Sequence, residues 1–194
     1  MEDFVTTPGR MARARAILDH IPENVLLDAA EIGVAAGLLS SILLKSRPLL
    51  TLYMVDLWAH NPSMAYRATG DPHSRDRGAP KWADLFRQAR RNTRHAVARA
   101  RLVRLDSVAA SKRVNDRSLD LVFIDDDHSR EGCTRSIRAW FYKAKPGGWI
   151  GGHDYKHTSR RFHFGVKEAV HDFFDPRGLV VKTGANFTWF VRIP

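Results

Sequence analysis

Hydrophobic residues follow two alternating patterns along the chain, short continuous runs and longer stretches with helical spacing. Runs such as Leu50–Val55 and Leu119–Ile124 are apolar almost throughout, which is typical of strands buried on both faces of a sheet. Strands that alternate with helices predict a parallel sheet covered by helices on both faces. We expect strands at Leu26–Ile32, Leu50–Val55, Arg101–Leu105, Leu119–Ile124 and from Trp149-Ile150 onward, with helices at Met11–Ile21, Leu38–Leu44 and Trp82–Val97.

The last third of the chain predicts two more helices and a reversed pair of strands. Two sets of apolar residues recur at helical spacing: Cys133, Ile137, Trp140, Phe141 and Ala144, then Val166, Ala169, Val170, Phe173 and Phe174. Lys145–Gly148 ends the first helix and Pro176 the second. Leu179–Lys182 and Phe187–Arg192 are joined so closely that they must be antiparallel. The pattern therefore predicts an α/β fold whose mostly parallel sheet finishes with an antiparallel strand.

The length of 194 residues suits a single domain, which we assign to residues 1–194. Residues 1–22 form a basic amino-terminal helix in this interpretation. Residues 60–80 are rich in Pro, Gly, Asp, Arg and Ser and lack periodicity, so they predict a long loop. Loops of that length are usually functional, and we expect this one to lie beside the substrate as a lid.

Charge is the unusual feature of the composition, with 31 Lys and Arg against 21 Asp and Glu, a formal net charge of +10. The arginines concentrate at Arg10–Arg15 and Arg87–Arg104. One interpretation is attraction to nucleic acid, a phosphorylated substrate or an anionic surface. The other, which we favour, is a pair of solvated helix faces, because the clusters lack the interleaved aromatic residues of single-strand binders.

Cys133 is the only cysteine, which excludes an internal disulfide framework and a cysteine-based zinc site. The first twenty residues lack the order of a signal peptide, and no run approaches the ~18 apolar residues of a membrane helix. We expect a cytoplasmic protein without a membrane partner.

Several polar residues follow the predicted strands directly. The first set is Glu31-Ile-Gly33-Val-Ala-Ala-Gly37, where glycines let the backbone approach a ligand. Ala35 and Leu38 occupy positions that the dinucleotide fingerprint fills with glycine, so the motif suits a ligand with an amino-acid end better than a pyrophosphate. Asp56 ends the second strand, where a carboxylate can accept the ribose hydroxyls of an adenosine. Asp106-Ser107 follows the third strand and would lie near an adenine, although Ser107 also suits a helix cap.

The fourth and fifth strands end in acids and histidines, at Asp125-Asp126-Asp127-His128 and Gly151-Gly152-His153-Asp154-Tyr155. Adjacent carboxylates are best tolerated beside a cation or a proton, while helix capping by Asp127 explains one of them. Since these strands would be neighbours, Asp125 and Asp154 should face each other and bind Mg²⁺ or a similar ion, with His153 completing the shell or orienting the substrate. His128 or His153 is a candidate general base.

Together these residues resemble a known family. The E-x-G at 31–33, Asp56, Asp106-Ser107, FIDDDH at 123–128, KPGGWIGGHDY at 145–155 and GVKEAVHDFF at 165–174 look like class I S-adenosylmethionine-dependent methyltransferases. More narrowly, they are similar to methyltransferase family 24, related to macrocin-type sugar O-methyltransferases and cephalosporin hydroxylase-like proteins. The resemblance spans about Leu27 to Val191 and implies a Rossmann-like, seven-stranded sheet with an antiparallel last strand.

The resemblance also implies a role for each matching residue. S-adenosylmethionine would contact Glu31, Gly33 and Gly37 with its methionine end and Asp56 with its ribose, and Leu57 and Trp58 would also belong to the cofactor site. Asp106 and Ser107 would approach the adenine, Asp125 would border both cofactor and metal, and Asp125, His153 and Asp154 would hold a divalent metal such as Mg²⁺. The expected catalytic residues are Asp125, His128 and His153. Asp126 departs from the family's usual small residue, and His153 stands where relatives often carry a second carboxylate.

The expected reaction is methyl transfer to a hydroxyl of a small molecule, by resemblance a sugar, and the charge favours a phosphate-bearing one. Methylation of an amine on a DNA base is less favoured, because such enzymes usually carry an Asn/Asp-Pro-Pro-Tyr/Phe turn after the fourth strand. A basic nucleic-acid-binding protein on the same fold and a hydroxylase-like relative stay open as alternatives. The basic amino-terminal helix can also serve a homo-oligomer contact.

Overall fold

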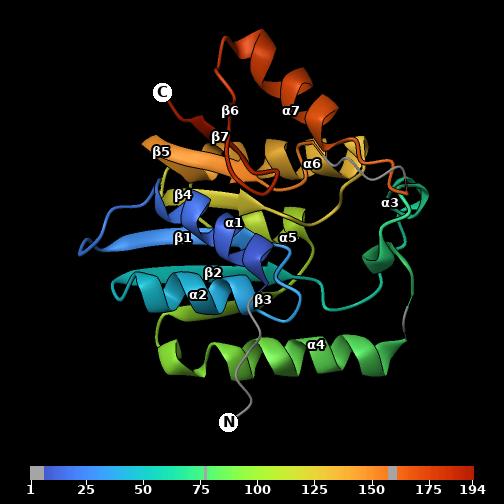
Figure 1. Cartoon of the computed structure of the whole chain (residues 1–194), viewed down its shortest axis with the longest axis horizontal. Coiled ribbons are helices and arrows are strands. Elements are labelled where there is room, and N and C mark those ends of the chain that lie inside the picture. The colour runs from blue at the N-terminus through green and yellow to red at the C-terminus, as the bar shows by residue number, and fades with distance from the viewer. Residues whose placement is uncertain (1–6, 77, 157–160) are drawn as a thin grey trace.

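The computed structural model describes residues 7–76, 78–156 and 161–194, which build one seven-stranded sheet between two layers of helices (Figure 1). The strand order is β3-β2-β1-β4-β5-β7-β6, and β7 alone runs against its neighbours. The strands are β1 (Leu27–Ile32), β2 (Leu50–Asp56), β3 (Ala100–Arg104), β4 (Leu119–Ile124), β5 (Ala144–Gly152), β6 (Lys182–Thr183) and β7 (Trp189–Arg192). The predicted mostly parallel sheet with a reversed last strand is confirmed.

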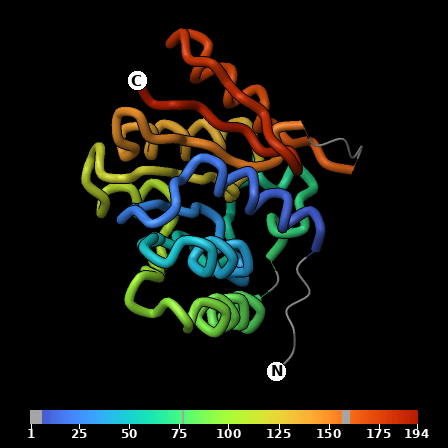
Figure 2. Tube along the Cα trace, turned by 60° about the vertical axis from the view of Figure 1, so that its left-hand side comes forward, coloured from blue at the N-terminus to red at the C-terminus, as the bar shows by residue number. Residues whose placement is uncertain are grey.

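Helices cover both faces of this sheet. They are α1 (Pro8–Leu18), α2 (Leu38–Ser46), α3 (Met64–Ala68), α4 (Ala79–Asn92), α5 (Ser107–Ser111), α6 (Arg130–Trp140) and α7 (Val166–Phe174), with 3-10 turns at Pro72–Ser74, Arg94–Ala96, Phe141–Lys143 and Asp175–Arg177. Both views show α1 beside α2 against the middle of the sheet (Figures 1 and 2).

Alternation along each strand divides the core into two clusters. Ala30, Ile32, Val122 and Ile124 point toward α5, α6 and α7, whereas their neighbours, such as Phe123, point toward α1, α2 and α4. Because successive side chains of a strand point to opposite faces, a central strand with both faces covered must be apolar over its buried length. That requirement explains why β4 has the bounds that the sequence predicts. Asp120, near the start of β4, is only partly buried and pairs with Lys145.

Several predicted boundaries differ from the structure, and three of them have a clear physical reason. The helix expected at Trp82–Val97 begins at Ala79 and ends at Asn92, since Pro80 favours the first turn and Thr93 leaves helical geometry. Ala144 belongs to β5, where it pairs with Leu119, and not to the preceding helix. The strand expected at Leu179–Lys182 is reduced to Lys182–Thr183, because Leu179 and Val181 pack on the core without pairing.

The two segments assigned from composition have partly helical structure. The amino-terminal helix begins at Pro8 and ends at Leu18, and residues 1–6 of the expected 1–22 segment lie outside the described residues. Residues 60–80 contain α3 and a 3-10 turn in place of an unstructured loop, with residue 77 outside the description. Both segments lie at the edge of the sheet where the parallel strands end, and they contribute to the cavity described below.

Candidate active site

Gly33 brings the ends of β1 and β4 together. Its φ is +91°, and a Cβ added there would lie 2.0 Å from the carbonyl oxygen of Asp125. No side chain fits at this close approach, so the loop after β1 passes directly over the end of β4. Gly37 has a different role: it precedes α2 with a φ of +70°, and a Cβ there would meet Ala89 of α4 at 3.0 Å.

Asp56 holds residues 33–37, the glycine loop, against the end of β2. One carboxylate oxygen accepts hydrogen bonds from the backbone amides of Val34 and Ala35, at 2.9 and 2.8 Å. The other accepts from the amide of Trp58 at 2.7 Å. A carboxylate has about four acceptor positions, so these bonds leave capacity for about one further donor. Trp58 itself is buried, and its indole donates to the carbonyl of Ala35 at 2.8 Å.

The loops after β1, β2, β3, β4 and β5 enclose one cavity of about 680 Å³, a size ordinary for small-molecule sites. Gly37 and Trp58 are not among the described residues that line it. The other predicted site residues do line it: Glu31, Gly33, Asp56, Leu57, Asp106, Ser107, Asp125, His128, His153 and Asp154. Acids far apart in the sequence therefore meet at a single edge of the sheet.

Glu31 is buried in the cavity wall, with 2% of its surface exposed. The Ser40 hydroxyl donates a hydrogen bond to it at 2.5 Å. Burial raises the pKa of Glu31 to about 8, and the Ser40 hydrogen bond only partly opposes that shift. A cationic group bound nearby would favour the ionised carboxylate.

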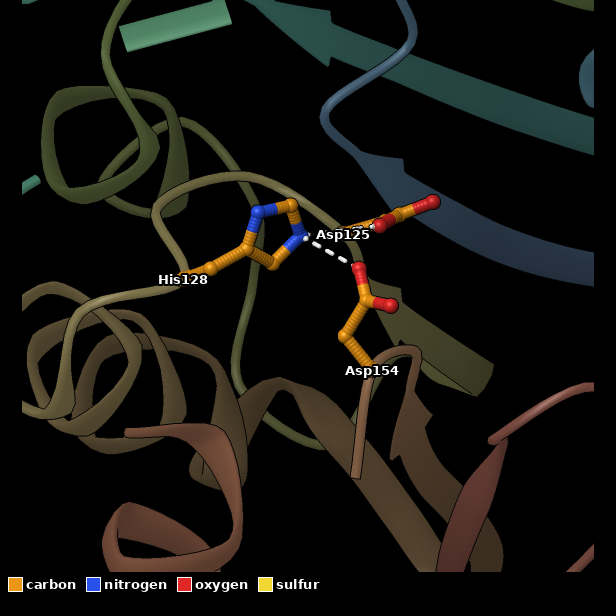
Figure 3. Close-up of side chains that lie close together, drawn as sticks. All are labelled: Asp125, His128 and Asp154. Atoms are coloured by element: carbon orange, nitrogen blue, oxygen red, sulfur yellow. Dashed lines mark hydrogen bonds and ion pairs between the residues drawn. The ribbon is translucent and has the colours of Figure 1, made fainter. Parts of the chain in front are cut away.

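Two acids and two histidines converge where β4 and β5 end. The imidazole of His128 lies with Nε2 at 3.2 Å from Asp125 and 3.1 Å from Asp154 (Figure 3). His153 Nδ1 lies 3.0 Å from Asp154 and 3.5 Å from Asp125. In Figure 3 the side chains of Asp125, His128 and Asp154 lie close together on the loops that follow the two strands, and a dashed line joins His128 to Asp154.

A guanidinium group from α1 completes the charge pairing. Arg13 donates to Asp125 and also to Asn186, the second contact at 3.3 Å. Burial alone would raise the pKa of Asp125, but Arg13 and His153 outweigh it and hold that pKa well below the usual range. Burial likewise opposes protonation of the histidines, yet the carboxylates raise the pKa of His128 well above its usual value and that of His153 to about 9.

Asp71, which is absent from the predicted site residues, contacts the ring nitrogen of His128 that does not face Asp125 and Asp154. Its carboxylate lies 2.6 Å from Nδ1 of His128 and accepts a hydrogen bond from the Tyr66 hydroxyl at 3.1 Å. Asp71, Tyr66 and His73 come from the 60–80 segment and line the cavity. The segment lacks periodicity, so the sequence indicated its general location but gave no signal for these residues.

Other predicted polar residues have mainly structural contacts. Asp106 caps α5 by accepting from the amides of Val108 and Ala109, at 3.0 and 3.1 Å. Asp127 is buried and accepts from the amide and hydroxyl of Ser129, which in turn caps α6. The cap expected of Asp127 is therefore made by Ser129, which Asp127 holds in place, and the cap expected of Ser107 is made by Asp106.

Asp126 and Ser107 belong to one hydrogen-bonded cluster. Asp126 accepts from the Ser136 hydroxyl at 2.7 Å, and burial raises its pKa to about 6. Ser107 lies 2.8 Å from the same hydroxyl and accepts from the Trp140 indole at 3.0 Å. Both residues also line the cavity, so these contacts fix their orientation within its wall.

The donor set at the end of β4 and β5 fits a divalent metal. Ligand atoms of Asp125, His128 and Asp154 all lie within 4.8 Å of one another. Asp71 binds the second ring nitrogen of His128, which is the usual support of a metal-bound histidine. A metal would displace the protons of the imidazoles and compete with Arg13 for Asp125. The cluster thus contains His128 in place of the expected His153, which lies beside it with Nδ1 3.0 Å from Asp154.

The cavity also fits a nucleoside with an amino-acid end. Glu31 and Gly33 lie at β1, Asp56 and Leu57 at β2, and Ser107 beyond β3, in the spatial order of the sheet. In this row Glu31 offers a carboxyl group to an ammonium group, and Asp56 offers an acceptor to a ribose hydroxyl. The cleft around them is partly apolar.

Comparisons with known proteins agree with this geometry. A family model described as a methyltransferase domain, methyltransferase family 24, matches residues 30–155. No curated protein has a significantly matching sequence. Among the described residues, no helix combines the length and the apolar character needed to cross a membrane.

Several solved structures share the fold. The calicheamicin methyltransferase CalS11 aligns with a TM-score of 0.62 at 16% identity, over 94% of this chain and 76% of that one. The O-methyltransferase NovP aligns with a TM-score of 0.61 at 18% identity, over 95% and 77%. The precorrin-6y C5,15-methyltransferase of Geobacter metallireducens GS-15 gives 0.62 at 15%, over 99% and 89%. At such low identities the likeness establishes the fold alone.

Proposed function

The chain belongs to the methyltransferase family whose model matches residues 30–155, and from this premise we propose that it methylates a hydroxyl group of a sugar or another small molecule. Methyltransferases of this family take the methyl group from S-adenosylmethionine, so the protein is an S-adenosylmethionine-dependent methyltransferase. The finer assignment, transfer to oxygen with the help of a divalent metal, is our proposal. NovP, an O-methyltransferase of the same fold, supports it.

One observation carries the proposal: the acids that end five parallel strands line a single cavity. In the proposed complex Glu31 and Gly33 border the methionine end, and Asp56 accepts one ribose hydroxyl with its remaining capacity. Leu57 and Ser107 flank the adenine. This placement brings the sulfonium methyl toward Asp125, where the acids and histidines gather. Alignment of the methyl group with the acceptor oxygen can supply roughly 7–11 kcal/mol of the barrier.

We propose that Asp125, His128 and Asp154 hold the metal, with His153 beside them. The chemistry that such an ion would supply is a lower pKa for an acceptor hydroxyl bound to it. Mg²⁺ prefers oxygen ligands alone, whereas an imidazole ligand suits Mn²⁺, Fe²⁺ or Zn²⁺. His153 lies 3.0 Å from Asp154, and it would accept a proton released there once a metal on the acids had displaced its own.

The acceptor would lie between the 60–80 segment and the chain after β5. Phe164 stacks on His128, with ring centroids 4.6 Å apart, and Phe162 stacks on Phe164 at 5.2 Å. Tyr66 approaches His128 edge-on. An aromatic wall with polar groups at its base suits the apolar face of a sugar or another ring that carries a hydroxyl. His73 and Arg135, which also line the cavity, favour an acceptor with a phosphate.

Calorimetric titration tests the proposal directly. We expect the wild-type protein to bind S-adenosylmethionine and S-adenosylhomocysteine, and to bind Mg²⁺ or Mn²⁺ in a separate titration. Failure to bind either nucleoside would remove the proposed function. Asp154→Asn should keep the cofactor affinity and lose most of the metal affinity, and Asn tolerates the φ of +58° at this position. Unchanged metal binding by this variant would dismiss the metal site and leave the cofactor site standing.

A further inference from the structure

Helix α1 carries three arginines, and two of them line the cavity. Arg10 and Arg13 are partly buried there, whereas Arg15 is exposed on the outer side of the helix. Ala14 and Ile17 are fully buried and hold α1 against the core cluster that includes α2. The helix therefore places two guanidinium groups, one turn apart, over the cofactor end of the cavity.

The two guanidinium groups differ in their partners. Arg13 is paired with Asp125 and Asn186. Among the described residues, no carboxylate or other acceptor contacts the guanidinium of Arg10. Burial and the neighbouring Arg13 both lower the pKa of Arg10. A partly buried cation beside a second cation, without a counterion of its own, is stabilised by any anion that enters the cavity.

Helical geometry fixes the part of the cavity that Arg10 reaches. Residues 10, 14 and 17 share one stripe of α1, since residues three or four apart lie on one face. Ala14 and Ile17 pack in the cluster that holds Leu39 of α2. Arg10 thus continues this buried stripe toward the start of α2 and the glycine loop, and Val34 and Leu38 line the cavity with it.

The wall near the glycine loop therefore carries charges of both signs. Glu31 supplies the carboxyl group, and Arg13 is near enough to lower its pKa. An α-amino acid has an ammonium and a carboxylate a few bonds apart, which match a carboxyl group and a guanidinium on one wall. Guanidinium groups bind carboxylates through paired, charge-assisted hydrogen bonds.

We propose that Arg10 binds the α-carboxylate of S-adenosylmethionine, while Glu31 faces its ammonium group. The assignment rests on the proposed function, because it requires the cofactor to occupy this cavity. It gives the amino-terminal helix, which precedes the residues matched by the family model, a direct part in cofactor binding.

A comparison of ligands that differ by single groups tests this assignment. Calorimetry without metal or acceptor would compare S-adenosylmethionine, its decarboxylated form, which lacks only the carboxylate, and 5′-methylthioadenosine, which lacks the whole amino-acid end. Arg10→Gln should weaken S-adenosylmethionine binding about 10- to 100-fold, the usual effect of losing a hydrogen bond to a charged group. Its affinities for the other two ligands should stay within about twofold of wild type.

The control variant is Arg15→Gln, which removes the same charge from the exposed side of the same helix and should leave all three affinities unchanged. Arg10→Lys should give an intermediate loss for S-adenosylmethionine alone. Equal losses for the full and the decarboxylated cofactor would overturn the assignment, and so would wild-type binding of S-adenosylmethionine by Arg10→Gln. If the wild-type protein bound none of the three ligands, the proposed function itself would fail, and the assignment with it.

Discussion

Single residues in this site combine structural and chemical tasks. Asp56 is the clearest case, because three backbone amides already occupy most of its acceptor capacity. The carboxylate that we expect to bind the ribose also holds the glycine loop in place. At this scale, loss of a side chain should therefore change stability as well as affinity, and both must be measured on each variant.

Glu31 gives a residue-scale prediction of pH dependence. Its pKa rises from a usual 4.5 to about 8 in the folded protein. Between those values the folded protein holds a proton that the unfolded chain has released, so the free energy of unfolding falls as the pH rises. For Glu31→Gln this loss should disappear, and the curves should diverge by on the order of 3 kcal/mol from about pH 5 to 8. Urea unfolding without cofactor measures the difference, and parallel curves would contradict it.

At the scale of elements, the site depends on how the ends of β1 and β4 meet. β1 and β4 pair in parallel, so Gly33 and Asp125 follow directly after neighbouring strands. The backbones approach so closely that Gly33, Glu31 and Asp125 lie within one small part of the cavity. The geometry of the site thus depends on a strand junction more than on any one side chain.

Substitution of Gly33 tests this junction at the element scale. Gly33→Ala adds a Cβ that would lie 2.0 Å from the Asp125 carbonyl oxygen, on a backbone with positive φ. We expect a loss of about 3 kcal/mol or more in the free energy of unfolding, and loss of cofactor binding. Gly178→Ala is the matched control: its φ is +65° but nothing lies within 4 Å of the added Cβ. This control should cost only about 1 kcal/mol, and equal losses in chemical denaturation would refute the steric argument.

The whole molecule carries a surplus of ten positive charges, and much of it lies away from the cavity. Arg87, Arg90, Arg91 and Arg94 are exposed on α4 and the turn that follows, as expected for a solvated helix face. By contrast, the charges around Asp125 are paired within the molecule. Interactions of the exposed arginines should therefore weaken with added salt more than the ion pairs around Asp125 do.

Salt dependence separates catalysis from the nucleic-acid-binding alternative at this scale. We expect weak retention on heparin that is lost by about 0.2 M NaCl, because exposed charges are screened over a Debye length of about 8 Å. An Arg87→Gln/Arg91→Gln double variant should elute earlier and keep the cofactor affinity of the wild type. A reduced cofactor affinity in this variant would show that the surface arginines act on the site. Tight, sequence-selective nucleic-acid binding would favour the alternative.

The regular spacing of apolar residues determined which strands and helices the sequence could predict. β4 was predicted to the residue because both of its faces are covered, so every position except Asp120 near its start is apolar. Leu179–Val181 was misassigned because apolar residues pack equally well without a strand partner. Ala144 was misassigned because it falls at helical spacing after Phe141, while its pairing with Leu119 depends on a residue far away in sequence.

The sequence by itself determined the order of strands and helices and the acids that end each strand, since burial periodicity and strand-end position are local properties. Only the tertiary structure decided how those acids are used. It showed that Asp71 binds His128, that Arg13 binds Asp125, that backbone amides occupy most of Asp56, and that Gly37 and Trp58 support the fold outside the cavity lining. The partners in these contacts lie far apart in the sequence, 112 residues in the case of Arg13 and Asp125. No local pattern encodes which distant group will pair with a buried charge.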